Sequence, residues 1–328
     1  MKPSPTVLII QTAFIGDVIL ATSLIESIRA KIPDAVIDFV LRKGNEELLI
    51  GNPGLRNVHV LDKARKYKSL IHLIKQFRQS RYDYVINVQR FATTGLMTIF
   101  SGGKVTIGFD KNPLSFLYSR KAVHQLGNQH EVIRNLRLLE PLGILEHARP
   151  RLYPSADEIA QVDKYKSHPY ITISPASVWF TKQWPAEKWV SVLKEVGDMR
   201  TFLLGGPRDF DHCEKIRSQL PNQHIANLSG TLSLLESAAL MKDARMNFVN
   251  DSAPLHLASA MNAPVTAVFC STIPDFGFGP LSDQSFIVQT KEILSCRPCG
   301  LHGKKACPQG HFRCATTIQP DQLIRSLA

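Results

Sequence analysis

An uninterrupted apolar segment near the amino terminus, Val7-Leu8-Ile9-Ile10, constrains the fold more than any other feature of this chain. Its residues are consecutive and mostly β-branched, as in a strand of a parallel sheet that is covered on both faces. A short turn and a helical pattern of apolar residues between Val18 and Ile28 follow at once. Strand, turn and helix in this order predict the opening of a βαβ unit, so we expect an α/β protein.

The same order of strand and helix recurs along the chain and starts afresh after the polar segment 154–168, which we interpret as a linker. Further strands are predicted at residues 36–41, 58–61, 84–88, 170–174, 201–204, 247–249 and 265–269, and helices at 67–81, 187–196, 211–218, 234–241 and 254–261. A length of 328 residues suits two domains of ordinary size. We therefore predict two doubly wound domains, residues 1–155 and 168–328, that face a cleft, with the last helix able to pack back on the first domain.

Basic residues are concentrated in the first predicted domain. The chain carries a formal charge of +11, and residues 1–150 contain 21 Lys and Arg against 12 Asp and Glu. This half is expected to meet an anionic partner: nucleic acid, an anionic membrane surface or a phosphorylated substrate, with a solvated basic face as the alternative. No apolar run is long enough to span a bilayer, and the opening MKPSPTVLII is too short for a signal peptide, so we expect a cytoplasmic protein.

The usual nucleotide-binding motifs are absent from the sequence. Neither G-x-G-x-x-G after a predicted strand nor G-x-x-x-x-G-K-[ST] occurs, which disfavours a dehydrogenase and a P-loop ATPase. The segment from Asn250 to His256 instead ends a strand and begins a helix, where Asp251 or Ser252 can cap and Pro254 suits the first position. Such a helix start attracts a diphosphate, with Asp251 turned toward a ribose or a capped N–H, although an ordinary capped helix is the alternative.

A second candidate for phosphate binding is the loop at residues 175–185, between a predicted strand and a predicted helix. Lys182 can neutralise a diphosphate leaving group, and the hydroxyl groups of Ser177 and Thr181 add donors. Trp184 is expected to pack the following helix against the sheet. The alternative for Lys182 is a solvated surface charge, as in most loops.

The candidate residue of the first domain is Asp17, which Gly16 places at the start of the first helix. There its carboxylate faces the carboxyl edge of the sheet and can accept a proton from a hydroxyl group. The alternative is a helix-start residue that the dipole favours. A pKa lowered by the helix would oppose the role of a base.

Taken in order, four segments resemble the lipopolysaccharide heptosyltransferases, the family 9 glycosyltransferases, and heptosyltransferase II most. They are residues 9–18, the loop from Ser177 to Trp184, the segment from Asn250 to His256, and a cysteine-rich carboxyl-terminal segment. The resemblance implies a GT-B fold, an ADP-heptose donor on the second domain, a lipid A-core acceptor on the first, and inversion at the anomeric carbon without a metal or other cofactor. The sequence departs from the family pattern at Ser23, where proline is common, and at Ala253, where glycine is usual.

The resemblance also implies roles for single residues. Asp17 is the general base, and Lys182, Ser177 and Thr181 bind the ADP phosphates. The remaining donor-site residues are Asp251, Ser252, Ala253 and His256 at the nucleotide and phosphates, and Gly206 and Asp209 near the adenosine. The densest basic group, Lys63, Arg65, Lys66 and Lys68, is the candidate for contact with the acceptor or the inner face of the cytoplasmic membrane, with a solvated helix start as the alternative. Nucleic acid is not an expected partner.

Four cysteines, Cys296, Cys299, Cys307 and Cys314, cluster near the carboxyl terminus at spacings that could chelate zinc. Reduced, packed thiols or a disulfide are the default for this cluster, and a structural zinc is the alternative.

Two other functions remain open at this point. One is a glycosyltransferase or an epimerase of the same fold that uses a different nucleotide sugar. The other is a basic module without catalytic activity that binds nucleic acid or membrane, which the charge alone suggests and which leaves the loops of the second domain unexplained.

Overall fold

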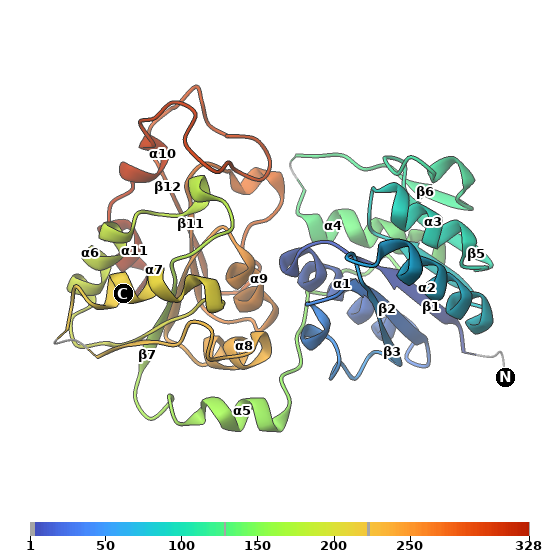
Figure 1. The fold of residues 1–328 in the computed structure, drawn as a ribbon, viewed down its shortest axis with the longest axis horizontal. Helices are drawn as coiled ribbons and strands as arrows, with labels where there is room; N and C mark the ends of the chain where they lie inside the picture. The colour runs from blue at the N-terminus through green and yellow to red at the C-terminus, as the bar shows by residue number, and fades with distance from the viewer. Residues whose placement is uncertain (1–3, 128, 222–223, 328) are drawn as a thin grey trace. The chain divides into compact units, whose positions relative to one another are not determined.

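The structure of the chain is a computed structural model that describes residues 4–127, 129–221 and 224–327. The chain divides into two compact units, Met1–Tyr153 and Pro154–Ala328, coloured from blue to green and from green to red in Figure 1. Each unit is built around its own parallel sheet of six strands. The predicted pair of doubly wound α/β domains is therefore confirmed.

The sheet of the first unit has the strand order β3-β2-β1-β4-β5-β6. Its strands are β1 (Thr6–Ile10), β2 (Val36–Arg42), β3 (Asn57–Leu61), β4 (Tyr84–Asn87), β5 (Val105–Phe109) and β6 (Arg120–Ala122), and its helices are α1 (Ile15–Lys31), α2 (Lys66–Ser80), α3 (Ala92–Phe100) and α4 (Glu131–Leu136). The apolar segment at residues 7–10 forms the buried central strand, as its continuous pattern predicted. Helices α2 and α3 contact each other on one face of the sheet, while α1 contacts α4 (Figure 1).

The sheet of the second unit has the strand order β12-β11-β10-β7-β8-β9. Its strands are β7 (Tyr170–Ser174), β8 (Arg200–Leu203), β9 (Ile225–Asn227), β10 (Met246–Asn250), β11 (Val265–Phe269) and β12 (Ser285–Gln289), and its helices are α5 (Ala156–Asp163), α6 (Ala186–Val196), α7 (Phe210–Arg217), α8 (Leu234–Lys242), α9 (Ala253–Ala260), α10 (Arg313–Thr316) and α11 (Asp321–Ile324). Helices α6, α7 and α11 share one apolar core with the sheet.

Short 3-10 turns complete the described chain. They are η1 (Glu46–Leu48), η2 (Ser115–Leu117), η3 (Arg137–Leu142), η4 (Phe180–Lys182), η5 (Pro207–Asp209), η6 (Pro274–Phe276) and η7 (Arg325–Leu327). Within the described residues, no helix is both long and apolar enough to cross a membrane.

In both sheets the direction in which the chain adds successive strands reverses at the centre of the sheet. This reversal of the strand order positions the candidate site. In the first unit the chain winds outward from β1 to β3 and then resumes at β4 on the other side of β1. In the second unit β7 and β10 are neighbours in the same way. The loops that follow such a pair of strands diverge, which opens a crevice at the carboxyl edge of the sheet where ligands usually bind.

Two segments differ from the sequence-based expectation. The segment 154–168 contains α5, which begins with a capping box between Ser155 and Glu158 and packs on α8. The sequence also left open a return of the last helix to the first domain. In the structure, Leu323 of this helix is buried in the core of the second unit, and α11 contacts α6.

Candidate functional site

Asp17 lies in the first turn of α1, directly after the turn that follows the central strand β1. Phe14 occupies the N-cap position in extended conformation, and its N–H donates to Asp17 Oδ2 at 3.2 Å. This bond forms because a helix start leaves free N–H groups and a carboxylate three residues on can reach back to them. The half-buried carboxylate of Asp17 is thus held at the carboxyl edge of the first sheet, beside the reversal between β1 and β4.

Burial, with a smaller contribution from the nearby charge of Glu131, raises the pKa of Asp17 to about 6. The N–H groups of Phe14 and Asp17 and the charge of Arg90 act in the opposite direction, but with smaller effect. The pKa of Asp17 is therefore raised overall, although the N–H groups of the helix start by themselves lower it. A carboxylate of this kind is mostly ionised at neutral pH and still basic enough to accept a proton.

Glu131 is the second carboxylate of this region and is held firmly in place. It begins α4, which packs on α1, and its Oε2 accepts hydrogen bonds from Arg134 Nε at 2.7 Å and Nη2 at 2.6 Å. Arg134 is almost fully buried and also donates to the carbonyl of Gln129. The charge that acts on Asp17 therefore has a fixed position.

The four basic residues predicted to contact the acceptor or membrane are all exposed and lie at the start of α2 or in the loop before it. Lys63 follows β3, and its pKa is lowered by partial burial and by the charges of Arg42 and Lys66. Arg42 ends β2, and its guanidinium lies 4.7 Å from the ring centroid of Phe14. Since β1, β2 and β3 are adjacent and parallel, this basic group and the start of α1 share one edge of the sheet.

In the second unit the structure brings together Lys182 and Asp251, which the sequence analysis selected on different loops. Lys182 Nζ lies 2.8 Å from Asp251 Oδ2, and the same oxygen accepts from Thr272 Oγ1 at 2.6 Å. Both charged side chains are mostly buried. Asp251 was expected to face a ribose or a capped N–H, and it forms an ion pair instead. The pair joins the loops after β7 and β10, at the reversal of the second sheet.

Asn250 fixes the shape of the loop that carries Lys182. Its Nδ2 donates to the carbonyl of Pro175 at 2.7 Å, and its Oδ1 accepts from the N–H of Trp184 at 3.1 Å, so one amide holds both ends of the loop. Trp184 is fully buried and meets Trp189 of α6 edge to face, as its predicted packing role requires. Ser177, between these anchors, is half-buried.

The side chain of Thr181 makes hydrogen bonds that the sequence analysis did not predict. Its side chain is 1% exposed, and its hydroxyl oxygen accepts from the N–H of Lys304 at 2.8 Å and from Ser271 Oγ at 3.0 Å. These bonds turn the hydroxyl inward. Thr181 therefore anchors the loop of Lys182, and its contact with phosphate stays a prediction.

At the start of α9 the N–H of Leu255 donates to the carbonyl of Ser252, and Pro254 has no N–H to offer. Ser252 is the N-cap residue, but its side chain makes no capping bond and instead donates to the carbonyls of Asn250 at 3.4 Å and Ala176 at 3.5 Å. Ala253 begins the helix and Pro254 follows. His256 is buried one turn further on, near Phe278.

Gly206 and Asp209, the predicted adenosine residues, form the turn between β8 and α7. The N–H of Gly206 donates to Asp209 Oδ2 at 2.8 Å, which closes this turn. Since β8 is the neighbour of β7, the turn lies at the same sheet edge as Lys182. Its contact with a nucleotide remains a prediction.

The cysteine cluster lacks the geometry of a metal site. All six cysteines are unbridged, and the described residues contain no group of three or more His, Cys, Asp or Glu side chains arranged to hold a metal ion. Burial and the neighbouring thiols raise the pKa of Cys314 to about 11. The spacing that allowed zinc is therefore not supported by the arrangement of Cys296, Cys299, Cys307 and Cys314.

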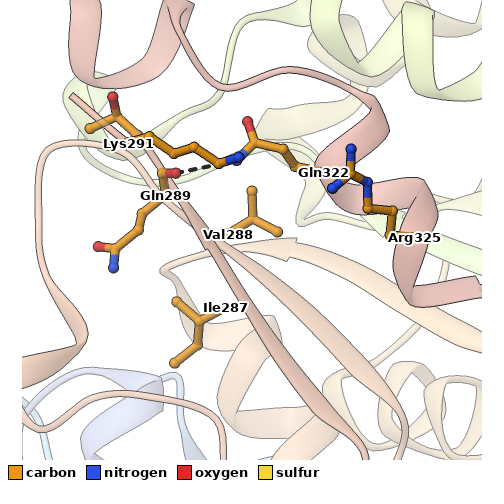
Figure 2. A pocket seen from close by; sticks show the side chains of 7 residues that line it. Ile287, Val288, Gln289, Lys291, Gln322 and Arg325 are labelled. Atoms are coloured by element: carbon orange, nitrogen blue, oxygen red, sulfur yellow. Dashed lines mark hydrogen bonds between the residues drawn. The ribbon is translucent and has the colours of Figure 1, made fainter.

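A pocket of about 360 Å³ lies elsewhere, along the edge strand β12 and the terminal helices. Figure 2 shows its lining, including Lys291 and Arg325, with the side chain of Gln322 bonded to the carbonyl of Gln289. None of the predicted site residues lines this pocket. The candidate catalytic and donor-binding residues lie on the loops at the reversal of each sheet and not in this pocket.

Four residues of the site were missed by the sequence analysis: Arg90 and Glu131 near Asp17, and Thr272 and Lys304 near Lys182. Arg90 follows a strand that was recognised, so the strand order would have pointed to it. Thr272 likewise follows a predicted strand, at residues 265–269, whereas Glu131 and Lys304 lie on segments whose position depends on tertiary packing. The cysteine pattern was the one local signal near Lys304.

Comparison with known proteins gives consistent results. Residues 70–308 match the family described as glycosyltransferase family 9 (heptosyltransferase). Lipopolysaccharide heptosyltransferase 3 of Escherichia coli is 26% identical over 280 residues, which cover 79% of this chain and 82% of that protein.

Solved structures resemble the chain over nearly its whole length. The family 9 glycosyl transferase of Veillonella parvula has a TM-score of 0.84 and 20% identity, and the match covers 99% of this chain and 97% of the other. E. coli ADP-heptose lps heptosyltransferase II has a TM-score of 0.81 and 21% identity, with 98% and 97% covered. These likenesses show the fold, which is the GT-B fold of two Rossmann-like units.

Proposed function

The chain belongs to glycosyltransferase family 9, the heptosyltransferases, and on that premise we propose that it transfers heptose from ADP-heptose to the inner core of lipopolysaccharide. It is a glycosyltransferase, and the proposal concerns its donor, its acceptor and its mechanism. One observation carries the proposal: each unit presents the needed chemistry at the reversal of its sheet. Asp17 supplies a carboxylate with a pKa of about 6, and Lys182 supplies a cation at the start of a diphosphate-binding helix.

We assign the proton transfer to Asp17 and the support of the leaving group to Lys182. The acceptor hydroxyl loses its proton to Asp17 as its oxygen bonds to the anomeric carbon of heptose. The bond from that carbon to the β-phosphate oxygen breaks at the same time, and its electron pair leaves with ADP. Lys182 and the N–H of Ala253 at the start of α9 offset the charge that grows on the diphosphate. Attack on the face opposite ADP inverts the anomeric carbon.

The donor and acceptor follow from the family and from the charge of each unit. One similar E. coli structure is that of an ADP-heptose lps heptosyltransferase II, and the similar E. coli protein is lipopolysaccharide heptosyltransferase 3. The excess of basic residues in the first unit suits an anionic lipid A-core acceptor at the inner face of the cytoplasmic membrane.

The decisive experiment incubates the protein with ADP-, UDP- and GDP-sugars and with lipid A-core acceptors, and follows the acceptor by mass spectrometry. The expected result is a mass gain of one heptose from ADP-heptose alone. Transfer of another sugar would replace the proposed donor. Conversion of a free sugar nucleotide with no acceptor present would indicate an epimerase, and binding without turnover a non-enzymatic module.

The pH dependence of transfer tests the assignment of the base. Because Asp17 must be unprotonated, kcat/KM is expected to fall about tenfold per pH unit below a pKa near 6. Glu131→Gln removes one negative charge beside Asp17, so the acidic limb should move to lower pH while Arg134 keeps an acceptor oxygen.

The matched control is Glu140→Gln, an exposed carboxylate in η3 of the same unit, which should leave the limb in place. A wild-type limb near pH 4, as for an ordinary aspartate, would contradict the assignment. If the acidic limb of the pH profile is unchanged in Glu131→Gln, the charge of Glu131 does not affect the pKa of Asp17.

The basic group of the first unit is expected to bind anionic membranes. Replacing Lys63, Arg65, Lys66 and Lys68 together by Gln should weaken binding to phosphatidylglycerol vesicles at least tenfold in a flotation assay, since each cation near the surface contributes about 1 kcal/mol. The control changes the same charge on the second unit, at the exposed Lys164, Lys194, Lys215 and Arg325. If both variants lose the same amount of vesicle binding, the effect depends on net charge and not on the basic group of the first unit.

A further inference from the structure

The ion pair of Lys182 leaves the donor site short of positive charge. Asp251 Oδ2 lies 2.8 Å from Lys182 Nζ, and both groups are mostly buried, so the two charges largely cancel. A nucleoside diphosphate brings at least two negative charges to this place. The dipole at the start of α9 is equivalent to roughly half an elementary charge, which does not balance them. A second cation close to Lys182 would offset the remaining charge of the diphosphate.

The cysteine-rich segment passes directly beside the loop of Lys182. We call residues 296–307 the strap. The N–H of Thr181 donates to the carbonyl of Lys304 at 3.1 Å, and the N–H of Lys304 donates to Thr181 Oγ1 at 2.8 Å. Two bonds in opposite directions fix the backbone of Lys304 next to the residue that precedes Lys182.

A glycine allows this close approach. Gly303 has φ +77°, and a Cβ placed on it would lie 2.9 Å from Lys182 Cγ and 3.0 Å from Thr181 Oγ1. Any side chain there would push against the stem of Lys182 and strain the backbone. The strap is thus in van der Waals contact with the candidate phosphate residue.

The strap is also tied to the sheet, so its position does not depend on the loop alone. Arg297 donates to the carbonyls of Cys270 and Thr272, each at 2.7 Å, and to Gln289 Oε1 at 2.8 Å. The N–H of Cys299 donates to the carbonyl of Ser271 at 2.8 Å. Thr272 is the residue that bonds Asp251, so the strap and the ion pair share one framework.

We propose that Lys304 is a donor-binding residue that supplies the second cation for the diphosphate of the sugar nucleotide beside Lys182. The residue is exposed, and its backbone is fixed within one residue of Lys182. A lysine carries its charge on a flexible stem of four carbons, so the two ammonium groups reach the same phosphates. The strap thereby gains a function that its cysteine pattern does not explain. This inference rests on the proposed function, because it assumes an ADP-sugar donor.

The test measures ADP binding by calorimetry on the full chain for the wild type, Lys304→Met, Lys304→Arg and Lys305→Met. Loss of Lys304 should weaken ADP binding about 5- to 20-fold, as for a charge-assisted contact to phosphate. Lys304→Arg should restore most of the affinity. Lys305→Met, the matched neighbour with the same charge change and exposure, should change it less than about twofold.

A second measurement uses AMP, which lacks the β-phosphate. Lys304→Met should weaken AMP binding less than ADP binding, since a diphosphate contact is lost only with ADP. Equal effects at Lys304 and Lys305, or no effect at Lys304 while the wild type binds ADP, would overturn the inference and leave the proposed function intact. A wild type that binds no ADP would overturn both.

Discussion

Asp17→Asn is expected to lower kcat for heptose transfer about 10²- to 10⁴-fold, the range that a positioned general base contributes. The side-chain amide keeps an oxygen that accepts from the N–H of Phe14, so the start of α1 should remain intact. What disappears is a group that can hold the proton of the acceptor hydroxyl. Affinity for ADP should stay at the wild-type value, because the donor residues belong to the second unit.

Asp62→Asn is the matched control for this variant. Asp62 also follows a strand of the first sheet and also caps a local N–H, that of Ala64, at 2.9 Å. Its substitution should leave kcat near the wild-type value. Transfer by Asp17→Asn at a rate close to wild type, with ADP binding retained, would show that another group takes the proton.

Eight strands were predicted from the sequence, among them the edge strand β3, while β5, β6, β9 and β12 were missed. The strand β1 is buried on both faces and its sequence is therefore a continuous apolar run. The edge strand β6 is Arg120-Lys121-Ala122, which carries no apolar signal. The strand β12 exposes Phe286 and Ile287, so its pattern is not that of a buried strand. Three of the four missed strands, β6, β9 and β12, lie at a sheet edge, whereas β5 is an inner strand that the sequence analysis overlooked.

In the candidate site, the residues could be predicted from local signals, but the contacts between them could not. Asp17, Lys182 and Asp251 were each found from a strand end that leads to a helix, which is a local signal. The ion pair between Lys182 and Asp251 depends on β7 and β10 being neighbours, although two other strands lie between them in the sequence. Such a crossover is a property of the whole sheet. The sequence could therefore name both residues but could not predict their ion pair.

Thr181 shows why a residue type alone is a weak guide to a ligand. A threonine in a loop beside a lysine suggests a phosphate donor, but the hydroxyl is used by Ser271 and Lys304, which come from 90 or more residues away. The pKa of Asp17 has a similar origin. The helix start lowers it as expected, and burial, which the local sequence does not encode, outweighs that effect.

The first unit is expected to lose about 1–3 kcal/mol of stability in Asp38→Ala, because this change removes the acceptor of the buried Tyr82 hydroxyl and an ion pair with the partly exposed Arg56. Asp38 is fully buried in β2 and accepts from Arg56 Nε at 3.0 Å and Nη2 at 2.7 Å, and from the hydroxyl of Tyr82. His59 Nε2 lies 3.5 Å from the same carboxylate. Burial would raise the pKa of Asp38, but the hydrogen bonds from His59, Arg56 and Tyr82 outweigh it and hold the pKa well below its usual range.

The tryptophan residues of the second unit provide an internal reference for measuring the stability of the first. All three tryptophans, Trp179, Trp184 and Trp189, belong to the second unit. In a denaturant titration, Asp38→Ala should therefore shift the early part of the unfolding curve followed by circular dichroism, while the tryptophan fluorescence transition stays in place. A shift of both would mean that the two units unfold as one. The exposed Asp34→Ala, with the same loss of charge, should shift neither.

The pH dependence gives the sign of this contribution. Because the pKa of Asp38 is lower in the folded state than in the unfolded one, the unfolded state binds the proton more readily. The stabilisation is therefore fully present above about pH 4, the usual pKa of an unfolded aspartate, and shrinks as the pH falls below it. The difference between wild type and Asp38→Ala should be smaller at pH 3 than at pH 7. A difference that does not change with pH would mean that lost packing, and not the charge of Asp38, accounts for the effect.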